Sequence, residues 1–209
     1  MKTELINISD NFELALNKAV KFLSEGFVIA VPTDTVYGLV CDFEDYDAIN
    51  KIFELKKRSS EKPLIAFCNS IQTIQSICEN IPEVFYKIAD KFFPGPLTIV
   101  LKKRSNIPDY ITCGFNTIGV RIPDNQFLLK LLNVVKSPLA STSANISGEQ
   151  SPISANQIFD TFNNSIPLIL DGGLSKLKIE STVIDISDGN LKILRESSIK
   201  KDELLEFWK

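Results

Sequence analysis

The residues most suggestive of chemistry form a cluster of cations between positions 56 and 62. Lys56, Arg58 and Lys62 fall within seven positions, directly before an apolar run that starts at residue 63. Lys56 and Arg58 end a predicted helix and Lys62 precedes the next predicted strand, so all three could converge on one anion. Cations in the last turn of a helix also interact favourably with its dipole, and most charged runs are solvated. Taken alone, the cluster is more typical of a helix end than of a binding site.

Three further segments place small hydroxyl side chains near the ends of predicted strands. They are "VPTDTVYGL" at 31–39, "STSANISG" at 141–148 and "ESTVID" at 180–185. Such hydroxyls, together with backbone N–H groups, could bind a ligand at one edge of a sheet or cradle a phosphate. The alternative is a set of ordinary polar turns and helix caps. Arg121 and Arg195, each at the end of a predicted strand, favour an anion site because they add two cations to the basic cluster.

An alternating α/β framework is needed to position these segments. Apolar residues at three- to four-residue spacing predict helices, and short apolar runs predict buried strands. The predicted helices are 12–23, 45–58, 71–78, 83–93, 125–135, 154–162 and 201–209, and the predicted strands are 27–32, 63–67, 97–102, 117–122, 138–142 and 166–171. Strands 182–186 and 191–195 are predicted to form a hairpin, and 103–116 is turn-rich. We therefore expect one α/β domain over residues 1–209, with a mixed sheet flanked by helices.

The amino-acid composition excludes several classes of active site. The chain has 209 residues, a net charge of −3 and no histidine, which argues against a dedicated nucleic-acid binder and excludes a Ser-His-Asp or Cys-His apparatus. The four cysteines are widely spaced, so we expect them to be reduced and mostly buried. Neither common nucleotide-binding loop occurs, and no signal peptide or transmembrane stretch is found, so we expect a cytoplasmic protein. What remains are reactions in which the protein positions substrates and neutralises charge.

The order and spacing of "PTDTVYGL", "FELKKRSSEKPL", "STSANISG" and "ESTVID" resemble the YrdC-type threonylcarbamoyl-AMP synthase family, over residues 25–196. The resemblance implies a single twisted α/β domain with a large, concave, basic cavity. It implies that L-threonine, bicarbonate and ATP, with Mg²⁺ on the phosphates, are joined into L-threonylcarbamoyl-AMP with release of pyrophosphate. A downstream threonylcarbamoyl transferase would then modify adenosine 37 of tRNA, and whether the chain itself binds tRNA is left open.

The resemblance also assigns roles by position. It implies that Lys56, Arg58 and Lys62 are the catalytic cations, with Arg58 and Lys62 on the ATP phosphates. The further implied ATP contacts are Thr117, Ser143, Asn145, Ser151 and Arg195, and the implied threonine contacts are Thr35, Phe67, Arg121, Ser141 and Ser181. Phe67 departs from the family pattern, in which many relatives have histidine. The chain resembles the short form of the family, without a second C-terminal domain.

Two alternatives remain open at this point. A non-catalytic module could grip tRNA or double-stranded RNA on a basic surface, although the net charge of −3 counts against it. A second enzymatic alternative is carbamoyl adenylation from carbamoyl phosphate, as in related domains of hydrogenase-maturation proteins. Those domains usually lie in much longer chains with zinc-finger and acylphosphatase segments, which this sequence lacks.

Overall fold

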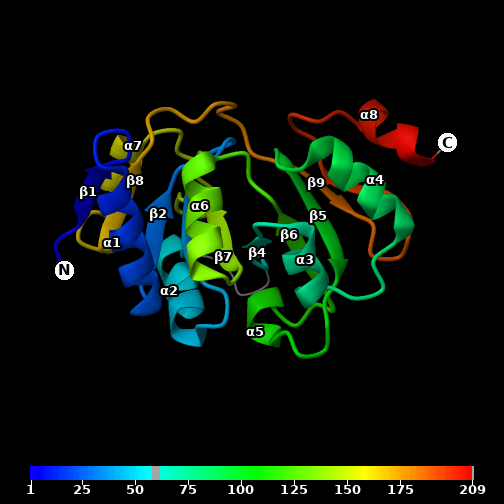
Figure 1. Ribbon diagram of the computed structural model, residues 1–209, viewed down its shortest axis with the longest axis horizontal. Helices are drawn as coiled ribbons and strands as arrows, with labels where there is room; N and C mark the ends of the chain where they lie inside the picture. Colours follow the sequence, from blue (N-terminus) through cyan, green and yellow to red (C-terminus); the bar gives the residue numbers. More distant parts are fainter. Residues whose placement is uncertain (58–61, 209) are drawn as a thin grey trace.

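A single mixed sheet organises the computed structural model, which describes residues 1–57 and 62–208 (Figure 1). Within these residues, ten strands lie in the order β1-β8-β2-β3-β7-β4-β6-β5-β9-β10. The strands are β1 (Glu4–Asn7), β2 (Ile29–Val31), β3 (Gly38–Asp42), β4 (Ile65–Phe67), β5 (Leu97–Lys102), β6 (Thr117–Arg121), β7 (Leu139–Ser143), β8 (Leu168–Asp171), β9 (Thr182–Asp185) and β10 (Lys192–Arg195). Strand β4 runs parallel to β6 and antiparallel to β7, so the sheet is mixed, as the sequence predicted.

Helices cover the sheet and connect most of its strands. They are α1 (Phe12–Ser24), α2 (Tyr46–Lys56), α3 (Ile71–Ile77), α4 (Glu83–Phe92), α5 (Asp109–Thr112), α6 (Gln126–Val135), α7 (Ala155–Phe162) and α8 (Lys201–Leu205), with a 3₁₀ turn at Glu206–Trp208. Helix α2 begins where the side chain of Asp45 accepts a hydrogen bond from the N–H of Ala48, at 2.9 Å. It ends where Lys57 adopts a left-handed conformation with φ of 48°. Lys56 is therefore the last helical residue.

The apolar core consists of two clusters, because successive side chains along a strand point to opposite faces of the sheet. In β2, Ile29 and Val31 join a cluster with α1 and α6, whereas Ala30 joins the cluster that contains α2, α3, α4 and α7. Both faces of the sheet are therefore covered where β2 lies, which explains why its sequence is uniformly apolar. None of the described helices is both long enough and apolar enough to cross a bilayer.

Two strands and one short helix differ from the sequence prediction. Strand β1 was not predicted because only Ile6 of its four residues is buried; it pairs with β8, with Glu4 opposite Leu168. Strand β3 begins at Gly38, within the "PTDTVYGL" segment, and pairs antiparallel with both β2 and β7. Helix α5 lies in the segment expected to be turn-rich. The predicted hairpin is confirmed, since β9 and β10 pair antiparallel.

Candidate active site

A cavity of about 350 Å³ lies on one face of the central part of the sheet. Every second residue of neighbouring strands lines it: Thr98 and Val100 of β5, Gly119 and Arg121 of β6, Ile65 and Phe67 of β4, and Ser141 and Ser143 of β7. Because successive residues of a strand point to opposite faces, this spacing places all of them on the same side. Val183 of β9, Arg195 of β10, Glu180, Ser181 and residues of the turn before β3 also line it.

Glycine at position 119 keeps the floor of this cavity open. A Cβ atom there would lie 3.0 Å from Cγ2 of Ile65 and 3.3 Å from Cγ2 of Thr98. A Cβ atom at Gly38 would lie 3.2 Å from Oγ of Ser141. Larger residues at these two positions would displace the side chains that form the walls.

Arg121 is buried in the cavity wall and is held by three acceptors. Its Nη2 donates to Oδ1 of Asp34 at 2.6 Å, its Nη1 to Oγ1 of Thr35 at 2.8 Å, and its Nε to the carbonyl oxygen of Gly95 at 3.0 Å. A guanidinium group has five N–H donors, so one on each Nη remains for a ligand. Burial lowers the pKa of Arg121, and the carboxylate of Asp34 acts in the opposite direction.

Phe67 and Ser141 lie on strands next to one another and line the same cavity. The centroid of the Phe67 ring is 5.9 Å from Cζ of Arg121, so the ring packs against the guanidinium. The hydroxyl of Ser141 is buried and has no hydrogen-bond partner among the described residues. A buried hydroxyl without a partner is an unusual cost, and a ligand in the cavity could satisfy it.

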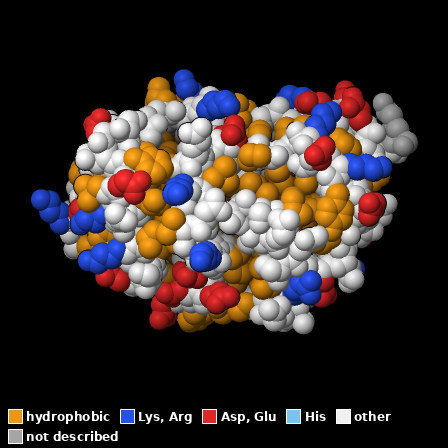
Figure 2. Space-filling view, in the orientation of Figure 1, with side chains coloured by type: hydrophobic (Ala, Val, Ile, Leu, Met, Phe, Trp, Pro, Cys, Tyr) orange, Lys and Arg blue, Asp and Glu red, His pale blue; other side chains and the backbone are white. Residues whose placement is uncertain are grey.

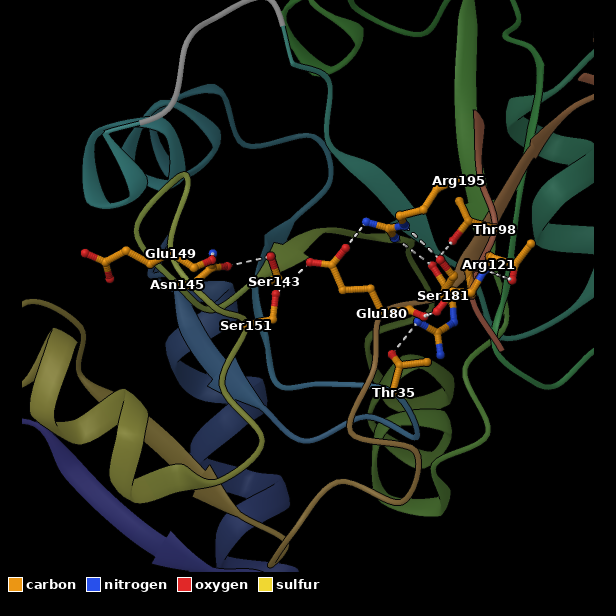
Figure 3. A network of polar contacts seen from close by, with 12 residues as sticks. Thr35, Thr98, Arg121, Ser143, Asn145, Glu149, Ser151, Glu180, Ser181 and Arg195 are labelled. Atoms are coloured by element: carbon orange, nitrogen blue, oxygen red, sulfur yellow. Dashed lines mark hydrogen bonds and ion pairs between the residues drawn. The ribbon is translucent and has the colours of Figure 1, made fainter. Parts of the chain in front are cut away.

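A second group of polar side chains lies on the side of the cavity formed by β5, β9 and β10 (Figure 3). The hydroxyls of Thr98 and Ser181 are 2.9 Å apart, and Nε of Arg195 donates to the carbonyl oxygen of Ser181 at 2.9 Å. Nη1 of Arg195 donates to Glu180, whose other carboxylate oxygen accepts a hydrogen bond from Ser151 at 2.6 Å. Glu180, which lines the cavity, thus joins the segment after β7 to the end of β10.

Lys56 bonds to the serine-rich loop that follows β7. Its side chain is almost fully buried, and its Nζ donates to the carbonyl oxygens of Ser143 and Asn145, the latter at 2.7 Å, and to Oδ1 of Asn145 at 3.2 Å. The N–H of Ser147 donates to the carbonyl oxygen of Lys56 at 2.9 Å. A buried ammonium requires such acceptors. These contacts favour a role in holding the loop over the direct catalytic role that we expected of Lys56.

The other predicted ATP contacts are distributed around the cavity. Arg58 lies outside the described residues, and Lys62 is exposed, one position before Pro63 of the cavity lining. Thr117 lies on β6 two positions before Gly119, and therefore on the cavity face of that strand. Asn145 and Ser151 line a smaller hollow of about 90 Å³ beside the main cavity, and Oγ of Ser143 donates to Oδ1 of Asn145 at 2.6 Å.

Several residues of the site were missed by sequence reasoning, namely Asp34, Gly95, Thr98 and Glu180. Asp34 stands inside the "PTDTVYGL" segment and Glu180 directly precedes Ser181, so a carboxylate within a hydroxyl-rich segment was the available signal. Gly95 acts through its carbonyl group, which no side-chain pattern reveals. The interpretation of "VPTDTVYGL" as an ordinary polar turn also holds in part, since Oγ1 of Thr33 donates to the carbonyl oxygen of Val36 at 2.5 Å.

The site offers cations and hydroxyls rather than a protein nucleophile. No disulfide joins two cysteines of the described residues, and Cys41, Cys68 and Cys78 are buried, as the sequence predicted. Burial raises the pKa of Cys78 to about 12, so its thiol stays protonated at neutral pH. Among the described residues, no group of three His, Cys, Asp or Glu side chains could hold a metal ion.

The charge of the cavity is more balanced than the sequence suggested. Its charged lining residues, among those described, are Arg121, Arg195 and Glu180, and Asp34 lies against Arg121. On the face shown in Figure 2, Lys and Arg side chains are interspersed with Asp and Glu. The predicted basic cavity stays a prediction, since Arg58 is outside the described residues.

Fold and site together define an α/β protein with a polar ligand cavity, bearing two arginines, on one face of a mixed sheet. The profile of the Sua5/YciO/YrdC family, described as "Telomere recombination", matches residues 21–197. The chain belongs to this family, which confirms the resemblance seen in its sequence motifs.

Known relatives agree with this assignment. A threonylcarbamoyl-AMP synthase from Pyrococcus abyssi is 38% identical over 203 residues, which are 97% of this chain and 60% of that protein. A putative threonylcarbamoyl-AMP synthase from Methanocaldococcus jannaschii is 34% identical over 208 residues, or 98% of each chain. The crystal structure of P. abyssi Sua5 complexed with L-threonine superposes with a TM-score of 0.91 at 36% identity, covering 98% of this chain and 61% of that one. The chain thus spans less than two thirds of the P. abyssi protein.

Proposed function

We propose that this protein joins L-threonine, bicarbonate and ATP into L-threonylcarbamoyl-AMP and releases pyrophosphate, which makes it a nucleotidyltransferase. The observation that carries the proposal is the buried Arg121, with one N–H donor left on each Nη by its described partners, in the same cavity as the hydroxyl of Ser141, which has no partner among the described residues. These groups suit the carboxylate and the hydroxyl of a small amino acid. The names of the relatives and the threonine-bound structure of P. abyssi Sua5 support the same substrate.

The chemistry requires no nucleophile from the protein. The amine of threonine attacks the carbon of bicarbonate and forms a carbamate with loss of water. An oxygen of the carbamate then attacks the α-phosphorus of ATP, and pyrophosphate leaves with the electron pair of the broken P–O bond. The site must place these groups in line and neutralise the triphosphate, which hydroxyls and fixed cations can do. This requirement fits a chain without histidine whose buried thiols stay protonated.

We assign the triphosphate to the part of the cavity between Ser143 and Arg195, with Arg58 and Lys62 as further cations. Among Arg58, Lys62 and Arg195, it is Arg195 that is both described by the structure and part of the cavity lining. Lys56 would act indirectly, since its amine bonds to the carbonyl oxygens of the loop that carries Ser143 and Asn145. Mg²⁺ would enter with ATP and screen its phosphates, because a triphosphate supplies the oxygen ligands that this cation prefers.

The product would pass to a threonylcarbamoyl transferase for N6-threonylcarbamoylation of adenosine 37 in tRNA, in the cytoplasm. The unstable mixed anhydride of the product favours direct use by such a partner. Direct tRNA binding by this chain is not required by the proposal.

The proposal is tested by measuring pyrophosphate release from ATP with and without L-threonine and bicarbonate. Release should need both substrates, and Arg58→Ala or Lys62→Ala should lower turnover at least ~100-fold, the scale of losing one preorganised charge donor. Lys57→Ala is the matched control, because Lys57 is an exposed cation in the same run and should leave turnover unchanged. Near-normal release in both Arg58→Ala and Lys62→Ala would contradict the phosphate assignment. Salt-sensitive RNA binding without ATP turnover would favour the binding-module alternative.

A further inference from the structure

Glu180, which lines the cavity, lies between Ser151 and Arg195 and bonds to both (Figure 3). Its Oε1 accepts a hydrogen bond from the hydroxyl of Ser151, at 2.6 Å, in the segment that leads from β7 to α7. Its Oε2 accepts one from Nη1 of Arg195, the last residue of β10. A carboxylate of the chain itself therefore occupies the space between a hydroxyl donor and a guanidinium donor.

The two arginines of the cavity are each matched by a carboxylate, but the two pairs differ in burial. The side chains of Asp34 and Arg121 are 2% and 3% exposed, whereas those of Glu180 and Arg195 are 36% and 43% exposed. Breaking a buried pair leaves an uncompensated charge without water, which is costly. An exposed pair contributes little to stability, because water replaces the lost contact. Glu180 can therefore leave Arg195 far more easily than Asp34 can leave Arg121.

The neighbouring backbone is fixed, so only the Glu180 side chain has to move. The hydroxyl of Ser197 donates to the carbonyl oxygen of Glu180 at 2.6 Å. Arg195 is held without Glu180, since its Nε donates to the carbonyl oxygen of Ser181 at 2.9 Å and its Nη2 to Oγ of Ser181 at 3.3 Å. The guanidinium would thus stay in place for another anion after the carboxylate has swung away.

We infer that Glu180 is an internal anion that occupies a phosphate position of the cavity until the nucleotide displaces it. The inference rests on the proposed function, in which ATP brings the triphosphate to Arg195. The O–H of Ser151 and the N–H of Arg195 are donors that a phosphate oxygen also accepts from. A carboxylate and a phosphate cannot use the same donors together, and two anions this close repel each other. Glu180 therefore lowers the affinity of the site for polyphosphates while it keeps the two segments bridged in the absence of nucleotide.

The test compares Glu180→Gln with wild type and with the matched control Glu196→Gln. Glutamine keeps the shape of the side chain and can still hydrogen-bond, but it loses the negative charge. Glu196 pairs with Lys200 at 3.6 Å and lies next to Arg195 in sequence, so its variant removes one charge from the same region. Dissociation constants for tripolyphosphate and for ATP would be measured by calorimetry. Glu180→Gln should bind tripolyphosphate about fivefold more tightly than wild type, and Glu196→Gln should stay within about twofold.

The direction of the change in tripolyphosphate affinity shows whether Glu180 competes with phosphate or only holds the two segments together. If Glu180 only holds the two segments together, Glu180→Gln will bind tripolyphosphate no more tightly than Glu196→Gln, and the inference is overturned. It is also overturned if none of the three proteins binds tripolyphosphate. A wild-type protein that releases no pyrophosphate from ATP, threonine and bicarbonate would contradict the proposed function. Tighter tripolyphosphate binding by Glu180→Gln would still support the internal anion in that case.

Discussion

At the residue scale, the guanidinium of Arg121 depends on the carboxylate of Asp34. Burying a cation costs several kcal/mol unless acceptors replace its lost water. Asp34, Thr35 and Gly95 supply those acceptors, and the Phe67 ring packs against the group. The importance of Arg121 could be predicted from the sequence, but its partner could not. Asp34 lies 87 positions away, and only the folded sheet brings the two side chains together.

We predict that Asp34→Asn lowers the free energy of unfolding by about 3 kcal/mol, because it leaves a buried guanidinium without its counter-charge. Urea denaturation would measure the loss. Asp124→Asn is the matched control, because Asp124 pairs with Lys176 on the surface at 3.2 Å and should cost less than about 1 kcal/mol. Equal losses in the two variants would show that the buried pair has no special role in stability.

At the scale of elements, the C-terminal end of α2 holds the serine-rich loop that follows β7. Lys56 contributes its amine to the carbonyl oxygens of Ser143 and Asn145 and its own carbonyl oxygen to the N–H of Ser147. On the other side, the N–H of Ala144 donates to the carbonyl oxygen of Tyr37 at 2.9 Å. The loop is therefore pinned between the end of α2 and the segment before β3. The basic run of the sequence thus includes at least one cation that acts within the protein.

We predict that Lys56→Met destabilises the protein by about 2 kcal/mol or more, because several carbonyl groups lose a charged donor in a buried place. Its KM for ATP should also rise, since the loop with Ser143 is no longer fixed. Lys57→Met should change stability by less than about 0.5 kcal/mol, as expected of an exposed side chain. A Lys56→Met protein of normal stability that loses turnover ~100-fold would instead support the direct catalytic role expected from the sequence.

The amphipathic helices and most apolar strands could be predicted at this scale because their patterns are local. Strand β1 could not, since only Ile6 of its four residues is buried, and strand β3 begins inside a hydroxyl-rich segment that is typical of a turn. Helix α5 comprises only four residues, too few for a helical period to appear.

At the scale of the whole molecule, the site depends on the order of strands across the sheet. Residues of β4, β5, β6, β7 and β10 meet at one cavity because these strands lie close together in the order β7-β4-β6-β5-β9-β10. The sequence predicted the α/β class, and the resemblance of its motifs indicated the family and many of the lining residues. It did not reveal which carboxylates oppose the arginines. Asp34 lies 87 positions from Arg121 and Glu180 lies 15 positions from Arg195, and local patterns carry no information on such pairing.

The proposed reaction joins threonine, bicarbonate and ATP into one adenylate. It is measured most directly by incubating the protein with ATP, L-threonine and ¹³C-labelled bicarbonate and identifying the adenylate by mass spectrometry. We expect a threonylcarbamoyl adenylate that carries one ¹³C atom, formed together with pyrophosphate and absent when any one substrate is left out. An adenylate that lacks the label, or ATP cleavage that proceeds without threonine, would contradict it.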